Sequence, residues 1–124
     1  MSVLLDRRRF ERFSVPPMYT AVRVRRLDGG SWVEGHARDV SEAGVRFDLD
    51  HPIELGAMVE IEVALPGVVP AETVRAVGRI VWVRADADEP GPVRMAAVVT
   101  RFARIQDRER LLIALGSGRF ARAA

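Results

Sequence analysis

The chain has 124 residues, of which 48% are hydrophobic. This length and composition are typical of one folded domain and not of a disordered segment. Cysteine is absent, which excludes disulfide bonds and thiolate metal sites. No apolar run reaches the roughly 18 residues of a membrane helix, and the first apolar residues precede the first charges, the reverse of a signal peptide. We therefore expect a cytoplasmic protein that does not insert into membranes.

Positive charge is concentrated near the N-terminus. The formal net charge is only +2, yet residues 1–26 contain seven arginines against Asp6 and Glu11. Four of these arginines fall within "RRRFER", residues 7–12. Pro16-Pro17 then interrupts regular structure. We predict a flexible arginine-rich arm over residues 1–18, which meets an anionic partner.

Between residues 19 and 102, several segments alternate between apolar and polar side chains, which is the period of β-strands, while residues 31–40 form a weaker strand pattern in which neither parity is cleanly apolar. Turn-forming residues such as Asp28-Gly29-Gly30 separate the alternating segments. Six short strands in succession favour a small antiparallel β-barrel or a compact sheet. The predicted strands are 19–27, 31–40, 44–50, 58–66, 73–85 and 93–102, and Gly78 is expected to mark a bulge or bend in the fifth.

After the last strand the apolar period becomes helical. Arg108, Leu111, Leu112 and Leu115 follow helical spacing, and Gly116 ends the pattern. We predict a C-terminal helix over residues 105–116 that packs on the barrel, and its leucines leave a homodimer contact open. The tail "RFARAA", residues 119–124, is expected to be frayed.

A second candidate segment follows the second predicted strand. Asp39, Val40 and Ser41 favour a turn, because Asp and Ser side chains accept hydrogen bonds from nearby backbone N–H groups. Gly44 permits a positive φ or the close approach of a ligand to the backbone. Taken alone, this pattern indicates a hairpin turn.

Taken together, the two segments resemble the PilZ domain family. The resemblance rests on Arg8-x-x-x-Arg12, with Arg7 directly before it, followed by Asp39-x-Ser41-x-x-Gly44. It implies a six-stranded barrel with a C-terminal helix over essentially the whole chain, and binding of the bacterial second messenger cyclic di-GMP. The chain departs from the family at Ala96-Ala97, where a glycine is usual.

The resemblance implies a ligand site formed by Arg7, Arg8, Arg12, Asp39, Ser41 and Gly44. The arginine fork matches the adjacent N7 and O6 acceptors of guanine, and arginine also stacks on a purine ring. We therefore assign Arg8 and Arg12 to guanine edges and phosphate oxygens, with Arg7 adding charge or a stacking plane. Phe10 and Phe13 are expected to pin the arm against the barrel.

The second motif supplies the complementary groups. Asp39 suits the guanine edge that carries the N1–H and N2 donors, and Ser41 can give its hydroxyl to a phosphate or a base. Gly44 keeps the backbone clear of the ligand. In the mechanism that we expect, the ligand orders residues 5–16 against the barrel, and the rearranged surface meets a protein effector.

Two other functions are compatible with the sequence. One is a PilZ-like adaptor that has lost the ligand and acts through a protein partner. The other is a small β-barrel RNA or DNA binder, which ranks last because the chain has few aromatic side chains to spare for base stacking. We expect no enzyme activity, no cofactor and no metal: His36 and His51 stand alone, and Glu60 and Glu62 are interpreted as a solvated pair.

Overall fold

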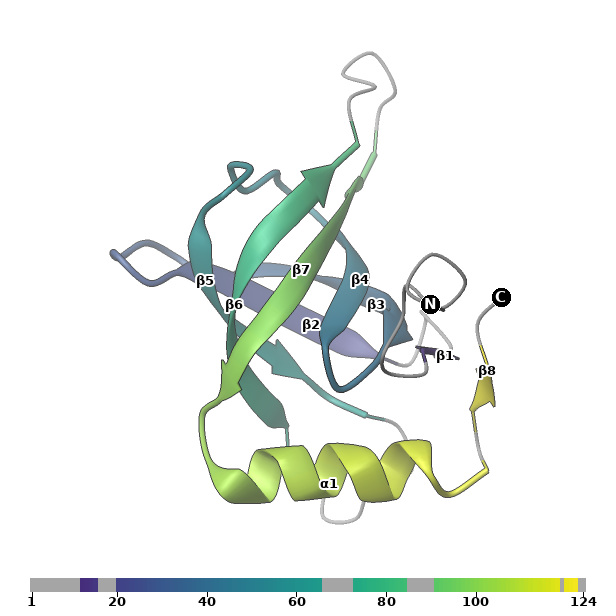
Figure 1. Cartoon of the computed structure of the whole chain (residues 1–124). Coiled ribbons are helices and arrows are strands. Elements are labelled where there is room, and N and C mark those ends of the chain that lie inside the picture. Colours follow the sequence, from purple (N-terminus) through teal and green to yellow (C-terminus); the bar gives the residue numbers. More distant parts are fainter. Residues whose placement is uncertain (1–11, 16–19, 66–72, 85–90, 119, 123–124) are drawn as a thin grey trace, which may run out of the picture.

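The fold is a closed antiparallel barrel with one helix across its end (Figure 1). The computed structural model describes residues 12–15, 20–65, 73–84, 91–118 and 120–122. Six of the described strands run around the barrel in the order β2-β5-β6-β7-β4-β3, and the pairing of β2 with β3 closes it. These strands are β2 (Ala21–Arg26), β3 (Val33–Val40), β4 (Gly44–Leu49), β5 (Met58–Val63), β6 (Val74–Val83) and β7 (Val93–Phe102). The predicted six-stranded barrel is confirmed.

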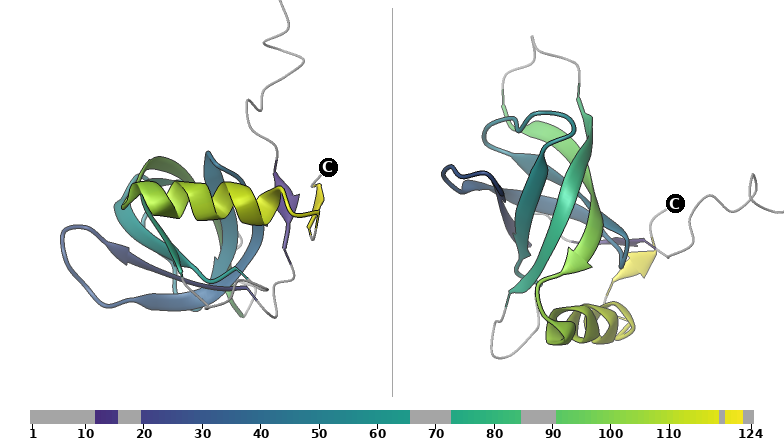
Figure 2. Two further views of the ribbon diagram at one scale, coloured as in Figure 1. Left: turned by 90° about the horizontal axis from the view of Figure 1, so that it is seen from below. Right: turned by 60° about the vertical axis from the view of Figure 1, so that its left-hand side comes forward.

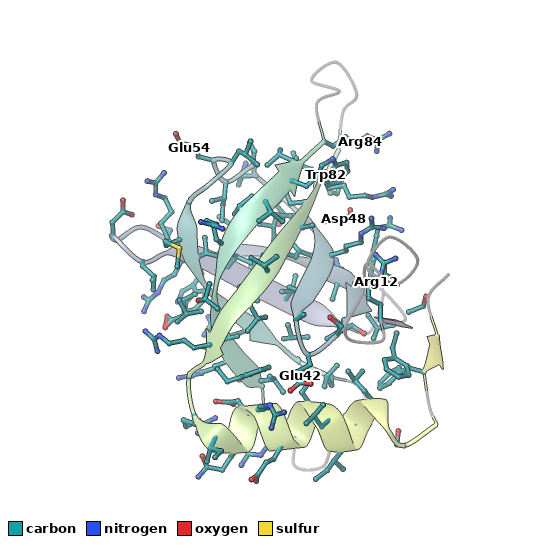
Figure 3. The ribbon with its side chains drawn as sticks, in the orientation of Figure 1. Arg12, Glu42, Asp48, Glu54, Trp82 and Arg84 are labelled. Carbon is teal, nitrogen blue, oxygen red and sulfur yellow. The ribbon has the colours of Figure 1, made fainter. Side chains whose placement is uncertain are left out.

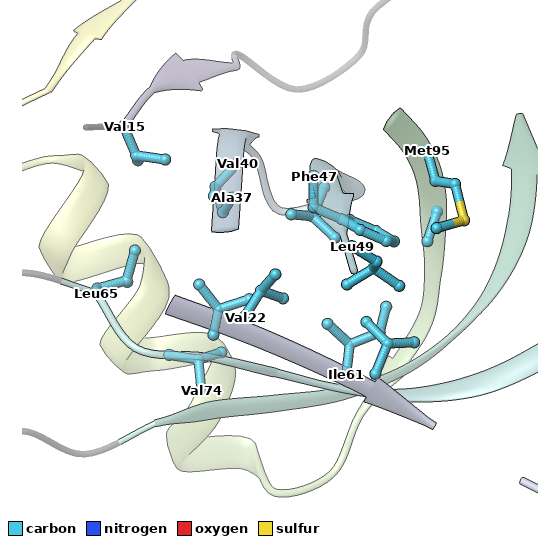
Figure 4. Packing of buried hydrophobic residues seen from close by; sticks show 14 of the residues in the cluster. Val15, Val22, Ala37, Val40, Phe47, Leu49, Ile61, Leu65, Val74 and Met95 are labelled. Atoms are coloured by element: carbon cyan, nitrogen blue, oxygen red, sulfur yellow. The ribbon is translucent and has the colours of Figure 1, made fainter. Parts of the chain in front are cut away.

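The alternating side chains fill the barrel from all six strands. In β4 the apolar residues Val45, Phe47 and Leu49 point inward, while Arg46 and Asp48 point outward. Burial of such residues supplies most of the favourable free energy of folding. Figure 4 shows part of the packed interior. The largest apolar side chains that are fully buried are Val22, Val24, Phe47, Leu49, Val59, Ile61, Ile80 and Met95.

Two register shifts bend the longest strand pair. The ladder between β6 and β7 shifts between Val77 and Gly78 and again between Ile80 and Trp82. A shift does fall at Gly78, where a bulge or bend was predicted, but its extra residue is Thr100 of β7; the extra residue in β6 is Val81, at the second shift. Because of the second shift, Val81 and Trp82 are both exposed on the outer wall.

One sequence interpretation fails at β5, the strand next to β6. Glu60 and Glu62 are not a solvated pair, because the Glu62 side chain is only 5% exposed and binds two arginines. These are Arg23 in β2, at 2.6 Å, and Arg75 in β6, at 2.9 Å. Burial of a carboxylate requires such partners, which come from strands far apart in the sequence.

Helix α1 (Ile105–Leu115) lies across one end of the barrel (Figures 1 and 2). Leu111 and Leu115 are buried against the core. At its start, the backbone N–H of Arg104 donates to Asp107 at 3.0 Å, and the Arg104 guanidinium binds the same carboxylate. The helix predicted over residues 105–116 is confirmed to within one residue at its C-terminal end.

Two short strands extend the barrel sheet beyond β3. Strand β1 (Phe13–Ser14) pairs with β3 on one side and with β8 (Ala121–Arg122) on the other. Phe120, just before β8, is buried in the core. The prediction of a frayed tail is therefore wrong for residues 120–122, because they gain a strand partner and apolar contacts that local sequence does not reveal.

Candidate functional site

The first and second motifs meet along the β1–β3 ladder. In this ladder Phe13 lies opposite Val40 and Ser14 lies opposite Asp39, and the Val15 N–H donates to the Arg38 carbonyl at 2.9 Å. Because the pairing is antiparallel, Arg12, which precedes Phe13 in the chain, lies on the side of Ser41. The last arginine of the first motif is thus next to the second motif. Phe13 is half-buried and packs against the core, as expected for a residue that pins the arm.

The other two arginines of the first motif, Arg7 and Arg8, lie outside the described residues, as do Phe10 and Pro16-Pro17. Residues 12–15 are the described part of the predicted arm. Phe13 and Ser14 pair along the edge of β3 as strand β1, and Val15 is buried in the core.

Ser41 is buried and uses its hydroxyl group inside the turn after β3. Its Oγ accepts hydrogen bonds from the N–H groups of Ala43 and Gly44, both at 3.1 Å, and lies 3.3 Å from the Gly44 carbonyl, to which the hydroxyl donates. The motif therefore straddles an element boundary: Asp39 and Val40 end β3, and Ser41 shapes the turn that leads into β4.

Gly44 is required by a neighbouring strand. Its φ is not positive. A Cβ atom added there would lie 2.6 Å from the carbonyl oxygen of Ala97 in β7, which is closer than real Cβ contacts. The absent side chain therefore lets β4 and β7 approach each other. Glu42, inside the same turn, forms an ion pair with Arg108 of α1, so that the turn is also tied to the helix.

Asp39 begins a row of side chains on the outer wall. It is 17% exposed and lies 3.7 Å from the terminal nitrogen of Arg46 in β4. The registers then place Ala96 of β7 opposite Arg46, and Trp82 of β6 opposite Ala96. Trp82 is 47% exposed. The small side chain of Ala96 thus lies between a cation and an aromatic ring in the strand register.

A second row runs beside the first, two residues further along β4. Asp48 accepts hydrogen bonds from Arg38 of β3 and Arg94 of β7, and the Arg84 N–H donates to the Arg94 carbonyl. Figure 3 shows Arg84, Asp48 and Arg12 along the same side of the molecule, away from Glu54. The wall formed by β3, β4, β7 and the end of β6 therefore carries more positive than negative charge.

The side chains that flank Asp39 and Asp48 on this wall lie outside both sequence motifs. Arg38, Arg46, Arg94 and Trp82 were not among the expected site residues. The alternation "VRFDL" already directs Arg46 and Asp48 outward on one face of β4, but only the strand order β3-β4-β7 shows which other side chains flank them.

Comparison with known proteins agrees with this architecture. The model of the PilZ domain family matches residues 6–115, which is most of the chain. The chain therefore belongs to the PilZ domain family. No curated protein matches the sequence. Solved structures that resemble this chain have low sequence identity to it, so the similarity bears on the fold alone.

Three of these structures illustrate the likeness, and each covers 90% of this chain. Bacillus subtilis inhibitor of motility MotI/DgrA has a TM-score of 0.69 at 12% identity, with 51% of its own length covered. Escherichia coli YcgR in complex with c-di-GMP (cyclic di-GMP) has a TM-score of 0.64 at 18% identity, with 46% of its own length covered. The PilZ domain of E. coli YcgR with c-di-GMP has a TM-score of 0.62 at 17% identity, with 91% of its own length covered. This chain thus spans about half the length of MotI/DgrA and YcgR.

In the described part of the chain, no group of three or more histidines and carboxylates is arranged to hold a metal ion. Within the same residues, no helix has the length and apolarity to span a bilayer.

Proposed function

We propose that this protein is a receptor for cyclic di-GMP, which it binds on the outer wall of the barrel with Arg7, Arg8, Arg12, Asp39, Ser41 and Gly44. The observation that carries the proposal is the β1–β3 pairing, which brings the end of the arginine motif next to the Asp39–Gly44 motif. Membership of the PilZ family and the two YcgR structures with the same ligand support it.

The residues of this proposed site divide into two groups. Arginines of the arm bind phosphate oxygens and guanine edges, and Asp39 accepts from the N1–H and N2 donors of a guanine. Ser41 and Gly44 act differently, because the Ser41 hydroxyl shapes the turn and Gly44 lets the two strands approach. Arg46 and Trp82, next to Asp39 on the wall, offer a guanidinium and a ring for stacking on the second base.

We propose further that residues 1–18, 19–102 and 105–116 work as one domain in the cytoplasm, with the arm folding over the ligand and the new surface contacting a protein effector. The exposed apolar side chains Met58, Val81, Trp82 and Val98 on the outer wall of β5, β6 and β7 favour such a contact. They equally fit the alternative, an adaptor that binds proteins and not the nucleotide.

Calorimetric titration distinguishes these two functions. We expect the purified protein to bind cyclic di-GMP with a Kd of about 1 μM, or about −8 kcal/mol. Cyclic di-AMP should bind far more weakly, because adenine has an amine where guanine has O6. Arg12→Ala should cost about 1.5–3 kcal/mol, the loss of a charged hydrogen bond. Asp39→Asn should cost less, because its amide oxygen still accepts.

The matched control is Arg25→Ala, which removes an arginine from β2, on the far side of the barrel. It should bind cyclic di-GMP like the parent. No detectable binding by the folded parent protein would favour the adaptor. Tight, salt-sensitive binding of polynucleotides with no preference for the cyclic dinucleotide would favour the RNA or DNA binder instead.

A further inference from the structure

Asp48 holds two arginines that reach it from the strands on either side of β4. The Nε of Arg38, in β3, donates to Oδ2 of Asp48 at 2.6 Å, and the Nε of Arg94, in β7, donates to Oδ1 at 3.3 Å. The Asp48 side chain is only 17% exposed, whereas both arginine side chains are 41% exposed. The carboxylate is therefore largely covered while the two guanidinium groups reach solvent.

Arg38 and Arg94 bind Asp48 in a way that leaves their terminal nitrogens available to a ligand. Each bond to Asp48 uses Nε, and within the described residues no hydrogen bond from the terminal nitrogens of Arg38 or Arg94 is found. A guanidinium fixed through Nε presents its terminal N–H groups in one direction, which suits the oxygens of a phosphate. Two arginines and one carboxylate leave a net charge of +1, which matches a single phosphodiester.

This triad lies next to the proposed ligand row. Asp48 is two residues beyond Arg46 in β4, and Arg94 is two residues before Ala96 in β7, so all four side chains are on the outer face. Residues two apart along a strand are about 7 Å apart. A ligand with two phosphates and two bases that binds at Asp39 and Arg46 is therefore long enough to contact the row of Arg38, Asp48 and Arg94 as well.

We propose that Asp48 is a positioning residue of the ligand site, which orients Arg38 and Arg94 as an anion-binding pair for the phosphodiester of cyclic di-GMP that faces away from the arm. This inference rests on the proposed function. It adds three residues that neither sequence motif contains.

The variant Asp48→Asn gives a test in which two explanations predict opposite signs. If Asp48 contributes only its negative charge to a cationic wall, its removal should strengthen the binding of an anion. If Asp48 orients the arginines, the same substitution should weaken cyclic di-GMP binding by about tenfold, although the wall becomes more positive. Calorimetry on the full chain measures the difference.

The arginines provide the second arm of the experiment. Arg38→Gln and Arg94→Gln should each weaken binding by about tenfold. In the double variant, adding Asp48→Asn should change the affinity no further, because the residues that it orients are gone. The matched controls are Glu60→Gln and Arg25→Gln, an Nε-linked carboxylate–arginine pair on β5 and β2, which lie opposite β4 and β7 in the barrel order.

The outcomes separate this inference from the proposed function. If the folded parent protein does not bind cyclic di-GMP, both fail. If it binds and Asp48→Asn binds as tightly or more tightly, Asp48 is not a positioning residue. If Asp48→Asn does not fold, as judged by thermal unfolding, the two arginine variants decide: parent-like affinity in both overturns the inference, and about tenfold loss in both supports it.

Discussion

Gly44 belongs to the ligand motif, but the packing of β4 against β7 by itself requires a glycine at this position. An added Cβ would lie 2.6 Å from the Ala97 carbonyl oxygen, which is backbone and cannot rotate away. The pairing of Gly44 with Val98 therefore depends on the absence of a side chain. Ala96 and Ala97, where the family usually has a glycine, lie on the strand that makes this contact.

Gly44→Ala should therefore lower stability whether or not the ligand is present. Forcing β4 and β7 apart costs about 1–3 kcal/mol, the range for an overpacked site. Chemical denaturation of the variant and the parent measures the free energy of unfolding. A variant with the stability of the parent but a weaker affinity for cyclic di-GMP would instead show that the glycine serves ligand clearance.

At the scale of elements, the start of α1 depends on one buried carboxylate. Asp107 is fully buried, and it binds the backbone N–H and the guanidinium of Arg104. Burial raises the pKa of Asp107, but hydrogen bonds from the Arg104 side chain and from the backbone outweigh it. The pKa therefore lies below its ordinary value of 3.8. The ionised form stabilises the helix start and its junction with the barrel.

The sign of this shift predicts a pH dependence. Because the pKa is lower in the folded state, the stabilisation by Asp107 is present above about pH 4 and is lost as the pH falls through the folded-state value. At pH 7, Asp107→Asn should lower the free energy of unfolding by about 1–2 kcal/mol and therefore lower the melting temperature. The difference from the parent should become progressively smaller toward pH 3.

Thermal unfolding of both proteins from pH 7 to pH 3 checks this. Glu109→Gln, which removes an exposed carboxylate from the same helix, is the control and should show no such convergence. A constant difference between Asp107→Asn and the parent at every pH would mean that the ionisation of Asp107 is not involved.

The regular elements could be predicted because their side chains repeat. Strands β4 and β5 alternate apolar and polar residues over five positions, the other barrel strands are β-rich runs bounded by turn residues, and α1 has apolar residues at helical spacing, so that local sequence identifies them. Strands β1 and β8 have two residues each and therefore no period. Their pairing depends on the arrangement of the finished barrel.

The site was only half predictable for a related reason. Arg12 and Asp39 belong to motifs that sequence can reveal, whereas Arg38, Arg94 and Asp48 come together only through the strand order. Glu62 was misinterpreted in the same way, since Arg23 and Arg75 reach it from two other strands. Contacts between distant segments leave little trace in local pattern.

At the scale of the whole molecule, the arm and the barrel should become more firmly joined when ligand binds. The contact includes the β1–β3 ladder and the bond from the Val15 N–H to the Arg38 carbonyl. Anything that binds only the joined state stabilises it by mass action. Cyclic di-GMP should therefore slow hydrogen exchange at residues 12–15, measured by mass spectrometry on the full chain.

Exchange in β5, on the opposite wall, is the internal reference and should slow less. If cyclic di-GMP binds but residues 12–15 exchange at an unchanged rate, the arm does not close over the ligand. Binding without this protection would separate affinity for the messenger from the proposed route to an effector.

The position of β1 between β3 and β8 has one more consequence. Among the described residues, β1 is the only strand that pairs with β8, so that β1, near the N-terminus, holds β8, near the C-terminus, in the sheet (Figure 2). If β1 detaches from the barrel, β8 loses the strand to which it is hydrogen-bonded. A fluorescent reporter near Arg122 would therefore register events at Arg12, although 110 positions of sequence separate the two.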